Sequence, residues 1–138
     1  MAHKYDDFNE SVVAKFRANN GVVQGWGDGL LLVHHRGAKS GIERISPAMS
    51  LRDDDGSWLI AASAAGAAKH PAWYFNLRAN PDTVVEAAGE GEVAVHVTEL
   101  EGTERDAAWA RFEQLSPGFA QYQSRTERTI PVLRLQRR

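Results

Sequence analysis

The sequence has 138 residues, 43% of them hydrophobic and 25% charged, with a formal net charge of −2 at pH 7. These values are typical of one soluble globular domain, and the near-neutral charge gives no reason to expect a nucleic-acid partner. No apolar run approaches the ~20 residues of a membrane span, and the N-terminal residues lack the order of a secretory signal. The absence of cysteine excludes disulfides and fits a reducing compartment. We therefore expect one cytoplasmic domain over residues 1–138.

The first half of the chain predicts one helix and three strands. Phe8, Val12 and Phe16 recur at helical spacing, and a loop rich in glycine and asparagine follows them. The continuous apolar run LLLVHH is typical of a strand that is covered on both faces. Pro47 indicates a strand edge or a bulge. The expected elements are a helix over residues 5–19 and strands over residues 30–35, 42–51 and 57–63.

The second half predicts two helices and three strands. Pro71 suits the first position of a helix, which ends at Asn80 because Pro81 follows. Thr103 and Asp106 indicate a weak capping box at the second helix. Residues 116–129 give no clear prediction. The remaining expected elements are strands over residues 83–88, 92–100 and 130–135, and a helix over residues 103–115.

The order of these elements predicts the fold class. Six strands are joined mostly by short turns, with helices between some of them, which favours an antiparallel barrel over βαβ units. We therefore expect a mainly β, α+β protein whose core is a barrel of about six antiparallel strands.

Several motifs suggest chemistry but lack the context that it needs. GAKSG joins two strands and lacks the P-loop glycines, and GWGDG has no preceding strand. His34 and His35 are adjacent on a strand, so they point to opposite faces and cannot chelate one metal together. We therefore expect no metal site. Ser50, Ser63 and Ser124 have no sequence context that would activate a nucleophile.

Two patterns remain that the core does not explain. Trp73 and Asn76 share one helical face, which suits either a flat ligand with polar edges or a core tryptophan beside a loop-capping asparagine. Lys39, with further cations nearby at Arg44 and at Lys69 before the helix start, suggests an anion cradle. That cradle requires the turn after residue 36 to lie near the helix start, which the sequence does not establish.

Four stretches carry a resemblance to a known family: GAKSGIERISP, LIAAS, KHPAWYFNLRANP and YQSRTERTIPVLRL. In these stretches, from about residue 30 to residue 135, the chain resembles the deazaflavin-dependent nitroreductase family, split-barrel oxidoreductases of actinobacteria that use coenzyme F-420 (8-hydroxy-5-deazaflavin). The resemblance implies a split barrel with the cofactor in a groove between barrel and helices. Lys39 to Ser40, with Arg44 and the strand through Pro47, match the part that holds the cofactor's phosphate and polyglutamate side. Together the two lines of argument predict these cofactor-binding residues: Ala38, Lys39, Ser40, Arg44, Ile45, Ser46, Pro47, Ala48, Met49, Ala61, Ala62, Ser63, Lys69, Trp73, Tyr74 and Asn76.

Two positions depart from the nitro-reducing relatives. Ala64 stands where those relatives often have a lysine, and Phe119 stands where they have a tyrosine near the substrate. A phenol can donate a proton to a reduced substrate, whereas phenylalanine cannot. Tyr122 and Ser124 remain as candidate catalytic donors on the substrate side.

The resemblance implies a reductase that transfers hydride from reduced coenzyme F-420 to an electron-poor small molecule such as an enone, a quinone or a nitro compound. The cofactor supplies the chemistry in such enzymes, and the protein supplies position and shelter from water. Two alternatives stay open: a reductase that uses FMN, and a module that binds a cofactor or ligand without catalysis. We expect a monomer or a homodimer.

Overall fold

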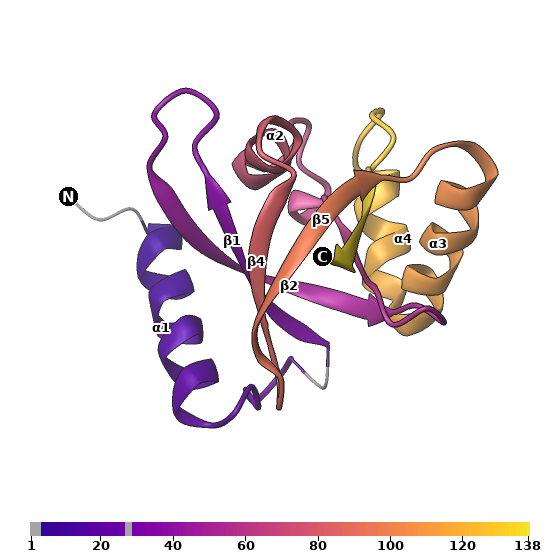
Figure 1. Cartoon of the computed structure of the whole chain (residues 1–138). Helices are drawn as coiled ribbons and strands as arrows, with labels where there is room; N and C mark the ends of the chain where they lie inside the picture. The colour runs from indigo at the N-terminus through magenta and orange to yellow at the C-terminus, as the bar shows by residue number, and fades with distance from the viewer. Residues whose placement is uncertain (1–3, 27–28) are drawn as a thin grey trace.

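The computed structural model of the chain describes residues 4–26 and 29–138. Six strands and four α-helices follow one another along the chain, with one short 3-10 helix, η1, after the third strand (Figure 1). The elements are α1 (Lys4–Ala18), β1 (Leu30–Arg36), β2 (Glu43–Arg52), β3 (Trp58–Ala61), η1 (Ala64–Gly66), α2 (Ala72–Ala79), β4 (Asp82–Ala87), β5 (Gly91–Glu99), α3 (Gly102–Leu115), α4 (Pro117–Ser124) and β6 (Val132–Arg137).

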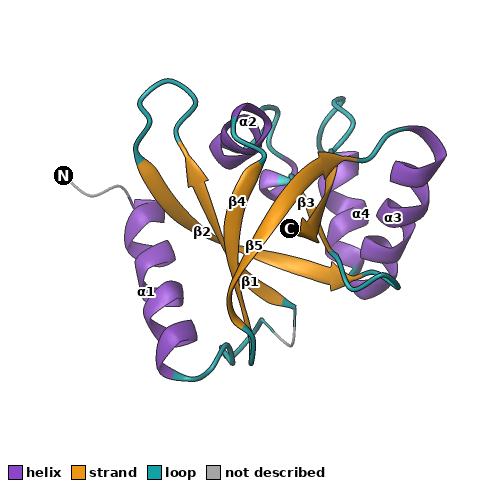
Figure 2. Ribbon diagram, in the orientation of Figure 1, coloured by secondary structure: helices purple, strands orange, loops and turns teal. Residues whose placement is uncertain are grey.

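The six strands form a closed antiparallel barrel in the order β1-β2-β3-β6-β5-β4. The barrel lies at the centre of the molecule, with α1 on one side and α3 and α4 on the other (Figure 2). This arrangement confirms the predicted fold class. The helix α1 packs on one core cluster of the barrel, and α3 and α4 share another.

The continuous apolar run in β1 is buried on both faces, as the sequence predicts. Leu31 and Val33 belong to the barrel interior, whereas Leu30 and Leu32 pack against Val12 and the rest of the apolar face of α1. All four β1 residues are at most 2% exposed. The strand therefore joins two hydrophobic cores, and burial on both faces explains why it does not alternate between apolar and polar residues.

The strand β2 is longer than its neighbours and changes its pairing partner along its length. It pairs with β1 along residues 43–49, and with β3 at residues 50–52. Among the described strands, residues 43–49 have no second partner, so this part of β2 forms an edge of the sheet. Pro47 lies within that edge and pairs in unbroken register with Leu32, which confirms the edge and excludes the bulge.

Several predicted boundaries differ from the structure. β3 ends at Ala61, so Ala62 and Ser63 lie beyond the strand. Pro71 is the N-cap of α2 instead of its first residue. The capping box was wrong, because Glu101 is the N-cap of α3 and no side chain caps that helix. The chain between α3 and β6 forms α4, whose first amides are capped by the hydroxyl of Ser116, which accepts from Gly118.

Among the helices that the structure describes, none is both long enough and apolar enough to cross a bilayer.

Candidate functional site

The hairpin between β1 and β2 presents exposed cations. Lys39 and Arg44 are exposed, and neither has a carboxylate within ion-pair distance among the described residues. The turn itself is closed by bonds between Gly37 and Gly41 and by the Ser40 hydroxyl, which accepts from the N–H of Ile42. A cation without a carboxylate partner keeps its full attraction for a ligand anion. The donor set therefore suits a polyanionic ligand tail.

Asn76 connects this hairpin to β2 through a chain of hydrogen bonds. Its side-chain oxygen accepts from the N–H of Ala38 at 3.0 Å, so its amide nitrogen is the donor to Nδ1 of His35 at 3.0 Å. His35 then donates from Nε2 to the hydroxyl of Ser46 at 2.8 Å. The polar face of α2 thus has a structural partner, and the Ser46 hydroxyl keeps its own hydrogen for another acceptor.

The protonation state of His35 agrees with this series of hydrogen bonds. Burial, with further contributions from the charges of Arg44 and His34, lowers the pKa of His35 to about 4. The ring is therefore neutral at physiological pH and has one donor and one acceptor nitrogen, as the chain of bonds requires.

The segment after β3 follows a strained path. Ala64 has a positive φ of 46°, which is uncommon for a residue with a Cβ, and Gly66 has a φ of 83°. A Cβ added to Gly66 would lie 2.7 Å from the carbonyl oxygen of Tyr122 and 3.1 Å from Cβ of Arg125. Only glycine lets the segment approach α4 this closely.

Arg128 fastens the same segment from the other side. It donates to the carbonyls of Ala62, Ser63 and Ala67 at 2.8–3.1 Å, and to Nδ1 of His70 at 2.9 Å. The bond to Nδ1 leaves the proton of the neutral imidazole on Nε2. Burial and the nearby charge of Arg128 lower the pKa of His70, so this tautomer is the one present at neutral pH.

A cavity of about 820 Å³ lies beside Tyr122, between β2 and the junction of α3 and α4. Met49, Phe119 and Tyr122 line it together with Trp26 and Leu115. The rings of Phe119 and Tyr122 meet edge to face, with centroids 5.7 Å apart. The volume and the aromatic lining suit a ring-sized ligand.

The other predicted site residues fall into three groups. Ala48 and Trp73 are half-buried, and both pack against the barrel core. Ile45 packs toward α1, and Tyr74 is buried, with a hydroxyl that donates to Glu99. Burial and the bond to Glu99 raise the pKa of Tyr74. The remaining residues lie elsewhere: exposed Lys69 precedes α2, half-buried Pro47 and Ala61 lie in strands, and exposed Ser124 donates to the carbonyl of Gln121 instead of lining the cavity.

Among the described residues, the hydrogen bonds between the hairpin strands and α2 lie in the second half of the helix, not at its start. The hairpin contacts Asn76 in the second half of α2, and Asn80 at its end donates to the carbonyl of Arg36. The start of α2 instead follows His70, which contacts Arg128. The cations of the hairpin and Lys69 therefore flank the helix at different ends.

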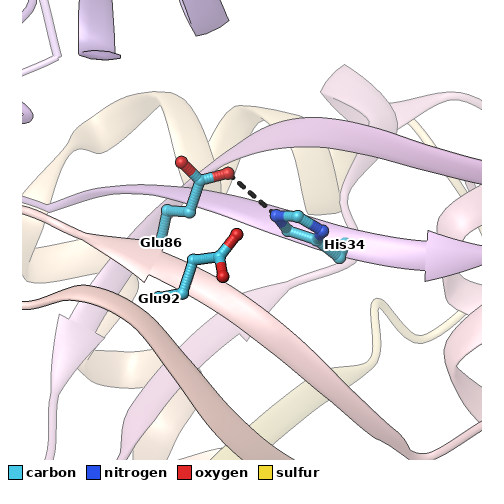
Figure 3. Close-up of side chains that lie close together, drawn as sticks. All are labelled: His34, Glu86 and Glu92. Atoms are coloured by element: carbon cyan, nitrogen blue, oxygen red, sulfur yellow. Dashed lines mark hydrogen bonds and ion pairs between the residues drawn. The ribbon is translucent and has the colours of Figure 1, made fainter.

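A second polar cluster lies on the opposite face of β1. His34, Glu86 and Glu92 place ligand-type atoms within 4.8 Å of one another (Figure 3). Both oxygens of Glu86 already accept from Arg17, at 2.8 and 3.1 Å, and one also meets Nε2 of His34 at 2.8 Å. Since Arg17 neutralises Glu86, we assign the cluster to an ion-pair network that fastens α1 to the barrel.

Comparison with known proteins identifies the family. A family model described as F420H(2)-dependent quinone reductase matches residues 9–136. The chain belongs to this family. F420H(2)-dependent quinone reductase Rv1261c of Mycobacterium tuberculosis is 38% identical over 113 residues, which cover 78% of this chain and 73% of that protein.

Solved structures agree with the family assignment. The F420-H2 dependent reductase FDR-A shares 37% identity and a TM-score of 0.70, over 78% of this chain and 94% of that one. A second structure, described as a domain-swapped dimer, shares 31% identity and a TM-score of 0.73, over 96% of this chain and all of the other. Both structures agree with the barrel fold of this chain, and the F420-H2 dependent reductase FDR-A also agrees with its oxidoreductase family.

Sequence reasoning missed the residues that shape the site from behind. These residues are Arg128, His35 and Gly66. No motif in the sequence marks them as part of a binding site, and the residues that they contact lie far away along the chain. The only signal was that Arg128 falls inside the stretch YQSRTERTIPVLRL and His70 inside KHPAWYFNLRANP.

Proposed function

We propose that the chain binds reduced coenzyme F-420 along the edge of β2 and transfers hydride to a quinone-type acceptor held in the cavity beside Tyr122. The observation that carries this proposal is the family match over residues 9–136, on a chain whose free cations and aromatic cavity suit the two ligands. Lys39 and Arg44 at the hairpin would hold the phosphate and polyglutamate side of the coenzyme. Ala48 and Trp73 would flank its ring.

The coenzyme, when bound, supplies the hydride from its reduced ring. The residues of the chain then have three tasks. The hairpin cations bind the tail, and the small side chain of Ala48 leaves room for a flat ring against β2. Met49 and Phe119 exclude water from the acceptor and orient it.

A quinone that accepts a hydride becomes an anion and must then take up one proton. Tyr122 lines the cavity and is half-buried, so its hydroxyl is the proton donor that we propose. Phe119, which lies against it, cannot donate. Ser124 is exposed and donates to the carbonyl of Gln121, so the cavity gives it no part in this step.

The test is a titration of the purified protein with reduced coenzyme F-420 and with FMN, followed by fluorescence, and then by turnover with a quinone, an enone and a nitro compound. We expect the coenzyme to bind much more tightly than FMN and the quinone to be reduced. Equal or tighter binding of FMN would support the FMN-dependent alternative. Tight binding without turnover of any acceptor would support a module that binds the coenzyme without catalysis.

We propose a homodimer over a monomer, because a relative with 31% identity is described as a domain-swapped dimer. Light scattering of the purified chain measures the mass. A mass equal to one chain at all concentrations tested would contradict the homodimer.

A further inference from the structure

Arg128 is half-buried and has no anionic partner among the described residues, whereas most arginines that contact the barrel form ion pairs and the unpaired Arg36 and Arg44 are exposed. Ion pairs among the described residues use these arginines: Arg17, Arg52, Arg78, Arg105, Arg111, Arg134, Arg137 and Arg138. No carboxylate of the described residues lies within ion-pair distance of Arg128, whose four contacts are all neutral. A half-buried cation without a carboxylate is costly, unless another anion or a structural task compensates for it.

The contacts of Arg128 give it such a task. Four of its five N–H groups are used, on the carbonyls of Ala62, Ser63 and Ala67 and on His70. These acceptors span the whole connection from the end of β3 to the start of α2. One rigid guanidinium thus sets the position of the segment that joins two parts of the proposed coenzyme site.

The same segment touches the acceptor cavity through its other side. Gly66 packs against the backbone of Tyr122, and Ala64 keeps its strained φ of 46° between the two anchors. A residue holds such a conformation only where its surroundings determine it. Arg128 on one side and α4 on the other provide those surroundings.

We propose that Arg128 is a positioning residue of the coenzyme site, which fixes the segment of residues 62–70 beside the coenzyme ring. It also gives this segment a positive charge that no carboxylate of the described residues neutralises. This inference rests on the proposed function. The coenzyme carries an ionisable 8-hydroxyl group, and a nearby positive charge favours the ionised form of such a group. Arg128 therefore favours the anionic form of the bound coenzyme.

Other titratable and charged groups near Arg128 come from the 62–70 segment, α2, β5 and the end of α4. His70, which it contacts, lies against the ring of Tyr74 with centroids 4.5 Å apart, and Arg78 lies over that ring from the same helix. Glu99 on β5 accepts from the Tyr74 hydroxyl, and the charges of Arg78 and Glu99 lie within 4.0 Å of each other and largely cancel. Lys69 and Arg125 are further cations, but both are exposed, so solvent screens their charges more than that of half-buried Arg128.

The test uses two substitutions that separate the charge of Arg128 from its fork of donors. Arg128→Gln removes the charge, and Arg128→Lys keeps it but cannot reach four acceptors. Arg105→Lys is the matched control. Arg105 likewise donates to the backbone, with two bonds to the carbonyl of Ile130, and none of its described hydrogen bonds is to the 62–70 segment. Absorbance against pH gives the pKa of the 8-hydroxyl in the bound coenzyme, and fluorescence gives the dissociation constant.

We expect Arg128→Gln to raise that pKa by roughly 0.5–1, because removing a nearby positive charge destabilises the ionised form of the 8-hydroxyl. Arg128→Lys should leave the pKa near the native value and weaken coenzyme binding about tenfold. Arg105→Lys should leave the pKa at the native value and change the dissociation constant by no more than about twofold.

Two results would overturn the inference: the same pKa in the native protein and Arg128→Gln, or an equal loss of affinity in Arg128→Lys and Arg105→Lys. If Arg128→Gln does not fold, the comparison of the two lysine variants decides. Failure of the native protein to bind the coenzyme is a separate result, which would overturn the proposed function itself.

Discussion

Replacing Gly66 by alanine tests the contact that holds the segment after β3 against α4. Gly66 has a φ of 83°, and an added Cβ would lie 2.7 Å from the oxygen and 3.0 Å from Cα of Tyr122. Both are backbone atoms, so no rotamer change relieves the contact. The left-handed conformation costs a residue with a Cβ about 1–2 kcal/mol, and an overpacked contact costs about 1–3 kcal/mol more. We expect a total loss of about 2–5 kcal/mol in the free energy of unfolding.

Gly56 provides a matched control for this prediction. Its φ is 85°, but an added Cβ there would have no atom within 4 Å. Gly56→Ala should therefore lose only the conformational part, about 1–2 kcal/mol. Urea denaturation of the two variants without ligands measures both losses, and quinone turnover at saturating coenzyme should fall only in Gly66→Ala, where Tyr122 is displaced. Equal losses of stability in the two variants would refute the argument that close approach requires glycine.

Three further predictions concern the coenzyme tail, the proton donor and the ion-pair network. Replacing Lys39 or Arg44 by alanine should weaken coenzyme binding by roughly 1.5–3 kcal/mol in low salt. The loss should be smaller in high salt, because both side chains are exposed. Unchanged affinity in both variants would exclude these two residues from the site. Phe119→Tyr should raise reduction of a bicyclic nitroimidazole by about 10²–10⁴-fold with little change in coenzyme affinity, and a variant as slow as the native protein would show that a phenol at this position is not sufficient. Hydrogen bonding from Arg17 lowers the pKa of Glu86, and His34 adds to the effect. The ionised Glu86 carboxylate therefore contributes to stability above its unfolded-state pKa, and this contribution is lost as the pH falls through the lowered folded-state pKa. Glu86→Gln should therefore unfold about 1 kcal/mol more easily than the native protein at pH 7, by an amount that shrinks below about pH 4, and a difference independent of pH would contradict the ion-pair assignment.

The sequence by itself determined the barrel and most of its helices. The continuous apolar run predicted that β1 is buried on both faces, and Pro47 predicted an edge in β2. Both features could be predicted because they depend on residues that are neighbours in the chain. The boundary errors at Ala61 and Glu101 arose where a loop, instead of a periodic segment, decides the end of an element. Residues 116–129 gave no prediction, since α4 is a short helix that depends on packing against α3 and η1.

Only the tertiary structure decided how the site is supported. Asn76 was ambiguous in the sequence because its amide could face a ligand or a loop, and its partners Ala38 and His35 lie 38 and 41 residues away. Arg128 resembled any solvated arginine, because the carbonyls that it binds are backbone atoms with no signature in the sequence. Local patterns determine which elements form, whereas the contacts that fix a binding site join distant residues, and these appear only once the barrel has closed.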